Sequence, residues 1–351
     1  MLAPQICIES RVIAEVELDV ASNSPSAGGE NARAPCAILK PPASPLDAIQ
    51  APAADLGYVD RVRANLAIEW AYFKVGVIWT GIICGAVIQW AHAAAHNLVY
   101  YIAGLNNVYG GPSNQLVDMG FLSFPDWSEL PFLPSNGCLY SLGLIAAFVA
   151  FSPSFGPAWV LGSPRIRTVQ ILWRGVIMVS ITAIFRAIGF LITVLPAPAP
   201  HCSALLFDPP RTTVQILFSL NADNGCSDLI FSAHMMYGIL SACLVTHYLR
   251  LGMALDAATH AVDQEPEGKQ RERAVKHGVI ALCWILVVME AFCIVAQRRH
   301  YSIDVWAALY TCPMTWISLS YFFPTDPAPV PLAPALMAPS DISGSSLFEL
   351  A

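Results

Sequence analysis

The sequence is poor in charged residues. Of its 351 residues only 12% are Asp, Glu, Lys or Arg, whereas 56% are hydrophobic, and the mean hydropathy is +0.55. A soluble domain carries roughly twice that charged fraction. The composition therefore excludes a soluble domain and predicts an all-α polytopic membrane protein. The start, "MLAPQICIESRVIAEVELDV", lacks the basic and apolar parts of a signal peptide, so we expect the first span to direct insertion.

Metal-ligand spacing is also missing. The ten cysteines form none of the short repeated pairs that bind zinc. We expect no metal and no other cofactor, and nothing in the chain indicates a nucleic-acid partner. Cys138, Cys202 and Cys226 fall in or beside loops on one side of the membrane. A disulfide can join two of them, but the sequence does not choose the pair.

Six apolar stretches have about the 20 residues that a helix needs to cross a bilayer. They run approximately over residues 73–95, 138–161, 171–194, 227–249, 275–297 and 301–323. Residues 1–65 are rich in Ala, Pro, Ser and acids without a sustained helical period, and 324–351 are rich in proline. Both tails are expected to be disordered. Residues 66–323 then form one six-helix membrane domain.

Lys and Arg are nearly absent from one set of loops. Residues 96–137 contain neither, and residues 195–226 contain only Arg211. The loops between spans two and three and between spans four and five hold the basic clusters. Because basic loops stay in the cytosol, both termini are expected to be cytosolic. The starts of spans four and six then face the lumen or the cell exterior.

Two histidines and an aspartate reach that face. His300 and Asp304 are four residues apart and share a helix face, so Asp304 can accept a hydrogen bond from one ring nitrogen. With no serine or cysteine neighbour as nucleophile, we hypothesise that His300 attacks and His234 serves as acid and base. Alternatively the pair is a structural hydrogen bond. Three arginines reach the same face and suit a phosphoryl group: Arg186, Arg298 and Arg299. Alternatively they only extend their charged ends toward the membrane surface.

Two segments resemble motifs of the sphingomyelin synthase family, ceramide phosphotransferases of the lipid phosphate phosphatase/phosphotransferase superfamily. The family's third motif, C-G-D-x-x-x-S-G-H-T, is similar to "CSDLIFSAHM", and its fourth, H-Y-[ST]-x-D-[VI], matches "HYSIDV" throughout. "FRAIGFLITVLPAPAPHC" and "SFPDW" are similar to the second and first motifs at fewer positions. The resemblance covers roughly residues 65–323. Three residues depart from the third motif: Ser227, Ala233 and Met235.

The resemblance implies His300 as nucleophile, Asp304 as its orienting group and His234 as the acid–base partner. It implies transfer of a phospho-head group, phosphocholine favoured, from a glycerophospholipid to ceramide within the membrane lipids. Candidate substrate contacts are Arg186, Asp228, Ser232, Arg298, Arg299, Tyr301 and Asp126. Four of them have structural alternatives to substrate contact. Asp228 can cap a helix, and Ser232 can bond to a helix carbonyl. Asp126 can be a solvated loop residue, and Tyr301 can anchor the chain at the membrane interface.

Several alternatives stay open. The head group can be ethanolamine or inositol, and the acceptor can be diacylglycerol instead of ceramide. A lipid phosphate phosphatase would carry a K-x6-R-P motif, which the chain lacks. A non-catalytic lipid sensor or scaffold on the same fold is a further alternative. The resemblance implies a Golgi or plasma membrane location with the site facing the lumen or exterior, and it is compatible with a homo-oligomer.

Overall fold

The computed structural model describes residues 58–73, 76–111, 113–130, 133–155, 166–219, 225–259 and 267–322. Within these ranges every regular element is helical, as predicted. One boundary needs correction, because residues 58–65, assigned to the disordered N-terminal region, begin helix α2, Tyr58–Phe73. Residues 1–57 and 323–351 lie outside the described part, so disorder of the two tails stays a prediction.

Six long helices follow α2: α3 (Gly76–Leu105), α5 (Leu133–Phe155), α6 (Thr168–Ile192), α8 (Ala233–Thr259), α9 (Glu267–Ala296) and α10 (Ser302–Phe322). Short helices lie between them: α4 (Met119–Ser123), the 3-10 turn η1 (Pro200–Cys202) and α7 (Thr213–Phe218). Five of the long helices, all except α10, are long and apolar enough to cross a membrane. The sixth predicted span is thus a helix, but its crossing stays a prediction.

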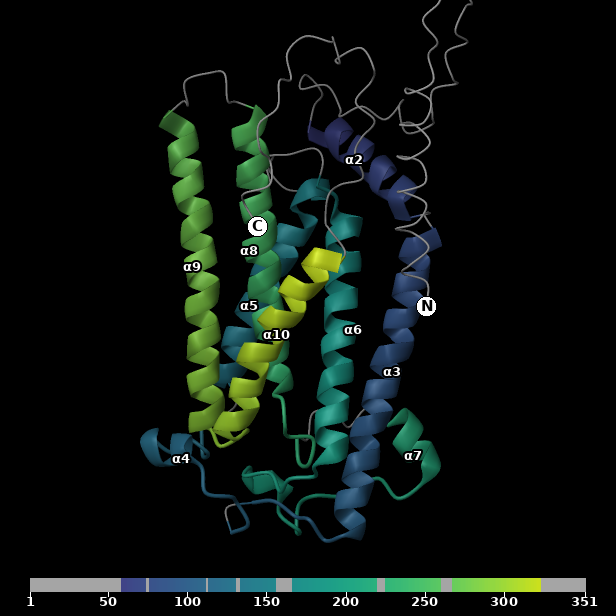
Figure 1. Cartoon of the computed structure of the whole chain (residues 1–351), viewed down its shortest axis with the longest axis vertical. Coiled ribbons are helices and arrows are strands. Elements are labelled where there is room, and N and C mark those ends of the chain that lie inside the picture. Colours follow the sequence, from purple (N-terminus) through teal and green to yellow (C-terminus); the bar gives the residue numbers. More distant parts are fainter. Residues whose placement is uncertain are drawn as a thin grey trace, which may run out of the picture. The chain divides into compact units, whose positions relative to one another are not determined.

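The long helices alternate in direction (Figure 1). Helices α3, α6 and α9 end where α5, α8 and α10 begin, and the short helices α4 and α7 lie at that same end. Helix α8 contacts α5, α6, α9 and α10, while α3 packs on α6. The core between them is built from buried apolar side chains such as Met235, Ile239, Cys283, Val287 and Ala308. The alternation gathers residues that are distant in sequence at one end of the helices.

Helix α2 is attached to α6 through one buried carboxylate. Glu69 is 6% exposed, and its two oxygens accept hydrogen bonds from the backbone N–H groups of Thr168 (2.9 Å) and Val169 (3.0 Å). These are among the first N–H groups of α6, which have no partner within the helix. A carboxylate at this position also interacts favourably with the helix dipole. Glu69 therefore fixes the start of α6 against α2.

Replacing Glu69 by alanine should destabilise the protein. The change leaves the buried N–H of Thr168 without an acceptor, at about 1–3 kcal/mol, and the partly buried N–H of Val169 as well. Thermal unfolding in detergent, followed by tryptophan fluorescence, should show a lowered Tm for Glu69→Ala and a smaller loss for Glu69→Gln, which keeps one acceptor oxygen. Asp60→Ala, at an exposed position on the same helix, is the control. An unchanged Tm in Glu69→Ala would contradict this account of the α2–α6 contact.

Candidate active site

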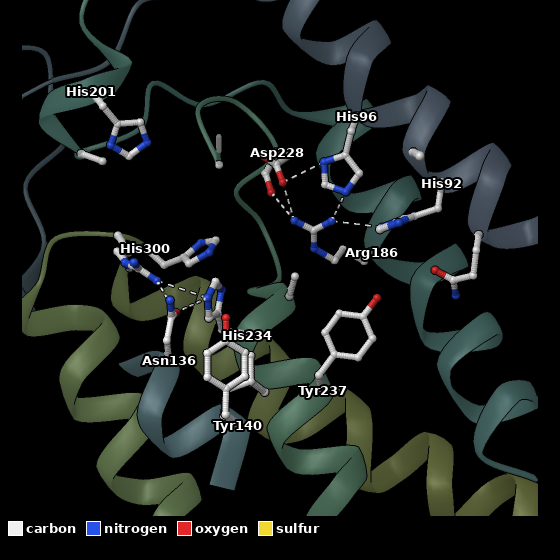
Figure 2. A pocket seen from close by; sticks show the side chains of 17 residues that line it. His92, His96, Asn136, Tyr140, Arg186, His201, Asp228, His234, Tyr237 and His300 are labelled. Carbon is white, nitrogen blue, oxygen red and sulfur yellow. Dashed lines mark hydrogen bonds and ion pairs between the residues drawn. The ribbon is translucent and has the colours of Figure 1, made fainter. Parts of the chain in front are cut away.

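A cavity of about 630 Å³ lies at the end of the helices where α5, α8 and α10 begin. Residues from α3, α5, α6 and α8 and from the α9–α10 turn line it. Figure 2 shows two groups of polar side chains around it, one near His234 and one near Arg186. Five of the predicted site residues line the cavity: His234, His300, Arg186, Asp228 and Arg299. The structure thus brings together the two histidines that the sequence placed 66 residues apart.

His300 is held by Asp304, as the spacing predicts. His300 Nδ1 lies 3.3 Å from Asp304 Oδ2, and that oxygen also accepts the backbone N–H of Tyr301 at 3.0 Å. Asp304 is fully buried, and His300 is 6% exposed. The contact with the carboxylate places the ring proton on Nδ1. His300 Nε2 is then the unprotonated nitrogen, which is the one required of a nucleophile.

His234 has two partners of opposite kind at one ring nitrogen. Its Nε2 lies 3.1 Å from Asn136 Oδ1, an acceptor, and 3.2 Å from Arg299 Nη1, a donor. Arg299 Nη1 also donates to Asn136 Oδ1 at 3.2 Å. When Nε2 carries a proton it can donate to Asn136, and when it has lost the proton it can accept from Arg299. Both protonation states of His234 therefore have a hydrogen-bond partner.

Arg299 places a positive charge beside both histidines. It precedes His300 in the turn between α9 and α10 and lines the cavity with it. Burial lowers the pKa of Arg299 to about 10, so its guanidinium is protonated at neutral pH. A planar guanidinium in this position matches the oxygens of a phosphoryl group.

Arg186, on α6, uses all five of its N–H donors within the protein. Nε donates to the carbonyl oxygen of Phe231 at 2.8 Å, and Nη2 donates to the carbonyl oxygen (3.1 Å) and the carboxylate of Asp228. Nη1 donates to Nε2 of His92 at 3.0 Å and to Nε2 of His96. The predicted phosphate contact of Arg186 stays a prediction, since here its donors hold protein groups.

Asp228 is the negative partner in this second group. Its Oδ1 accepts the hydroxyl of Tyr100 at 2.8 Å, and its Oδ2 lies 2.9 Å from His96 Nδ1 and also binds Arg186. Burial alone would raise the pKa of Asp228, but Arg186, His96 and Tyr100 together hold it well below its ordinary value. The group is therefore an ion pair whose two residues are each 1% exposed, surrounded by neutral hydrogen-bonding side chains.

The segment that carries Asp228 is fixed at several points. A disulfide joins Cys202 to Cys226, which resolves the choice among three cysteines that the sequence left open. Phe231 has a φ of 93°, a region that bulky side chains rarely adopt, and its carbonyl is the one bound by Arg186. The backbone N–H of Ser232 donates to the carbonyl of Asp304 at 3.2 Å. The segment therefore connects the Arg186 group with the His300 group.

Five predicted site residues are not among those that line the cavity: Asp304, which lies behind His300, and Asp126, Arg298, Tyr301 and Ser232. Asp126 binds the backbone N–H of Ser128 and pairs with Arg298, which donates to the carbonyl of Phe121. Tyr301 is buried instead of standing at an interface, and its hydroxyl donates to the carbonyl of Pro196. Ser232 accepts the N–H of Met235 and thereby caps the start of α8, the role considered for Asp228.

The sequence reasoning missed several residues that line the cavity: His92, His96, Asn136, Tyr140 and Tyr237. His92 and His96 carried a usable signal, since they show the same four-residue spacing as His300 and Asp304 inside an apolar stretch. Of the departures from the third motif, Ala233 lines the cavity, whereas Met235 is buried in the core.

Replacing Asp228 by asparagine should cost about 3–5 kcal/mol of stability, because it leaves Arg186 buried without its counter-charge. The Asp228 carboxylate contributes stability above its ordinary pKa of 3.8. As the pH falls below 3.8, the carboxyl group of Asp228 is protonated in the unfolded chain first. The contribution is then lost progressively until the pH passes the lower pKa that Asp228 has in the folded protein. In thermal unfolding, the Tm difference between wild type and Asp228→Asn should therefore be widest near neutral pH and narrow below about pH 4.

The matched control for this change is Asp208→Asn, which breaks an exposed Asp–Arg pair at 2.8 Å with Arg211. An exposed pair contributes about 0–1 kcal/mol, so its Tm should stay close to that of the wild type at every pH. Equal Tm losses in the two variants would mean that burial of the Asp228 pair does not matter.

Comparison with known proteins finds a family model and several relatives that match this chain. Residues 225–321 match the family model described as PAP2 superfamily C-terminal, which includes His234, His300 and Asp304. The chain is 28% identical over 299 residues to a phosphatidylinositol:ceramide inositolphosphotransferase of Oryza sativa subsp. indica, covering 83% of this chain and 76% of the relative. Phosphatidylinositol:ceramide inositolphosphotransferase 3 of Arabidopsis thaliana is 27% identical over 273 residues, covering 73% of this chain and 80% of the relative.

A second kind of relative matches over a shorter part. Phosphatidylcholine:ceramide cholinephosphotransferase 1 of Rattus norvegicus is 26% identical over 145 residues, or 38% of this chain and 29% of the relative. Residues 225–321 thus match the PAP2 superfamily C-terminal model, and the resemblance to ceramide phosphotransferases, predicted from the motifs, is confirmed.

Proposed function

We propose that the protein transfers the phosphorylated head group of a glycerophospholipid to ceramide through a phosphohistidine at His300. The observation that carries the proposal is the joint placement of the His300–Asp304 pair and His234 in one cavity. The relatives support the choice of substrates, since the names of both kinds contain a phosphatidyl lipid and ceramide.

In the first step, His300 Nε2 attacks the phosphorus atom of the donor lipid. A P–N bond forms, and the P–O bond to diacylglycerol breaks. His234 gives its Nε2 proton to the departing oxygen and then accepts a hydrogen bond from Arg299. Asp304 stabilises the His300 ring, which becomes positively charged as it bonds to phosphorus.

In the second step, the primary hydroxyl of ceramide attacks the same phosphorus atom. His234 takes the hydroxyl proton and can then donate to Asn136 Oδ1. The P–N bond breaks, and His300 returns to its starting state. The guanidinium of Arg299 lies beside His234 and is placed to neutralise the phosphoryl oxygens in both steps.

The head group that the relatives favour is inositol. The inositolphosphotransferases match 73–83% of the chain, whereas the cholinephosphotransferase of the rat matches 38%. This shifts the preference from phosphocholine, expected from the motifs, to phosphoinositol.

We also place the site on the lumenal or outer side of a Golgi or plasma membrane. Support for this side comes from the Cys202–Cys226 disulfide next to the cavity, since disulfides persist in oxidising compartments. Assembly into a homo-oligomer stays a proposal.

His300→Ala should lower ceramide conversion by about 10⁶-fold, the scale seen when a nucleophile is removed from such a group of residues. The assay uses the purified protein in nanodiscs, fluorescent ceramide and one donor at a time: phosphatidylinositol, phosphatidylethanolamine or phosphatidylcholine. Wild type should form a new polar sphingolipid, and donor labelled with ³²P should leave acid-labile, alkali-stable label on the protein.

The control variant is His277→Ala, which removes an exposed histidine on α9 and should keep wild-type conversion. Ceramide conversion retained in His300→Ala would sink the phosphohistidine mechanism. Conversion of diacylglycerol instead of ceramide would identify the rival acceptor, and no conversion by the wild type with any donor would favour a sensor or scaffold.

A further inference from the structure

A polar stripe runs along the face of α3 that borders the cavity. Gln89, His92 and His96 stand at positions i, i+3 and i+7, which share one face of a helix, and all three line the cavity. Ala93, on the same face, also lines it. Polar side chains inside an apolar membrane helix are costly and usually functional. The transfer chemistry assigned to His234 and His300 does not use them.

Arg186 fixes which ring nitrogens of the stripe carry protons. Its Nη1 donates to Nε2 of both His92 and His96, and a nitrogen that accepts a hydrogen bond carries no proton. Both histidines are therefore neutral with the proton on Nδ1. The Nδ1–H of His96 faces Asp228, whereas that of His92 has no recorded partner among the described residues. His92 thus has a donor available to a molecule in the cavity.

Gln89 offers a second donor on the same stripe. Its Nε2 is buried and has no hydrogen-bond partner within the described part of the chain. A buried amide without a partner costs about 1–3 kcal/mol. That cost is removed when a ligand in the cavity accepts the hydrogen bond.

The charges on this side of the cavity cancel. Asp228 is the one carboxylate among the described cavity residues, and it is paired with Arg186 and contacted by His96 and Tyr100. A quaternary ammonium head group is bound by a cage of aromatic faces; the cavity contributes two tyrosines, Tyr140 and Tyr237, and no unpaired carboxylate among its described lining residues. A neutral ring with several hydroxyl groups needs neutral donors and acceptors, which the stripe supplies.

We infer that Gln89 and His92 are the specificity-determining residues that select a polyhydroxylated head group. The inference rests on the proposed function, because it places the phosphate beside His300 and Arg299. The hydroxyl-bearing ring then extends across the cavity to α3. Figure 2 shows the arrangement, with His300 and Asn136 near His234 on one side and Arg186 and His92 on the other.

The test measures kcat/KM for ceramide conversion with phosphatidylinositol and with phosphatidylcholine in nanodiscs. Gln89→Leu and His92→Phe should each lower the phosphatidylinositol value about 3- to 10-fold, mainly through KM, because each removes one neutral hydrogen bond. The phosphatidylcholine value should change less than twofold in Gln89→Leu. His92→Phe also removes an acceptor of Arg186, so its effect on selection is taken from the ratio of the two values. His92→Gln keeps an N–H donor and should recover part of the loss.

The matched control is His277→Phe, the same substitution at an exposed position on α9. It should leave kcat/KM unchanged with phosphatidylinositol and with phosphatidylcholine. Equal losses with both donors in the stripe variants, or no loss with phosphatidylinositol, would overturn the inference. A wild type that strongly prefers phosphatidylcholine would overturn it too and leave the proposed transfer intact.

A binding measurement separates this inference from the proposed function. Native mass spectrometry of the full chain, with phosphatidylinositol and phosphatidylcholine added at equal concentration, reports retained lipid without any turnover. Retention of phosphatidylinositol that falls in Gln89→Leu and His92→Phe supports the inference, even if no ceramide is converted and the proposed function fails. Equal retention in wild type and both variants would show that the stripe does not select the head group.

Discussion

The guanidinium of Arg186 is the interaction on which the cavity depends. A charge within a membrane-spanning helix is expensive unless it is paired and its donors are filled, and here five protein acceptors meet all five N–H groups. These acceptors come from α3 and from the segment before α8, so a side chain of α6 connects three parts of the chain. Removing any one acceptor would leave one buried N–H group of Arg186 without a hydrogen bond, which lowers the stability of the protein.

The arrangement also couples recognition to chemistry. The residues from Asp228 to Ser232 are bound on one side by Arg186 and on the other by the backbone carbonyl of Asp304. A displacement of this short segment would therefore change the position of the carboxylate that orients His300. The Cys202–Cys226 disulfide shortens the free length of the preceding loop and limits such displacement. Rigid support of this kind is what a nucleophile needs to stay in line with its target.

The sequence predicted the features that depend on local spacing. The apolar stretches predicted the long helices, and four-residue spacing predicted the His300–Asp304 contact. Helix ends were less accurate, because capping groups such as Ser232, and not loss of hydrophobicity, decide where α8 begins. The partners of Arg186 were not predicted, since they lie 42 to 94 residues away in the chain and show no periodic pattern. Without contacts in space, an arginine that binds phosphate and one that holds protein groups have the same sequence signal.

The order of synthesis gives Arg186 a further significance. A chain emerges from the ribosome with its N-terminus first, so the two histidines of α3 are made 90 and 94 residues before Arg186, while Asp228 follows it by 42 residues. The arginine of α6 is therefore synthesised before its counter-ion. During that interval the imidazoles of α3 are the acceptors already in place. Synthesis thus supplies two of the five acceptors of Arg186 before the carboxylate that completes the pair.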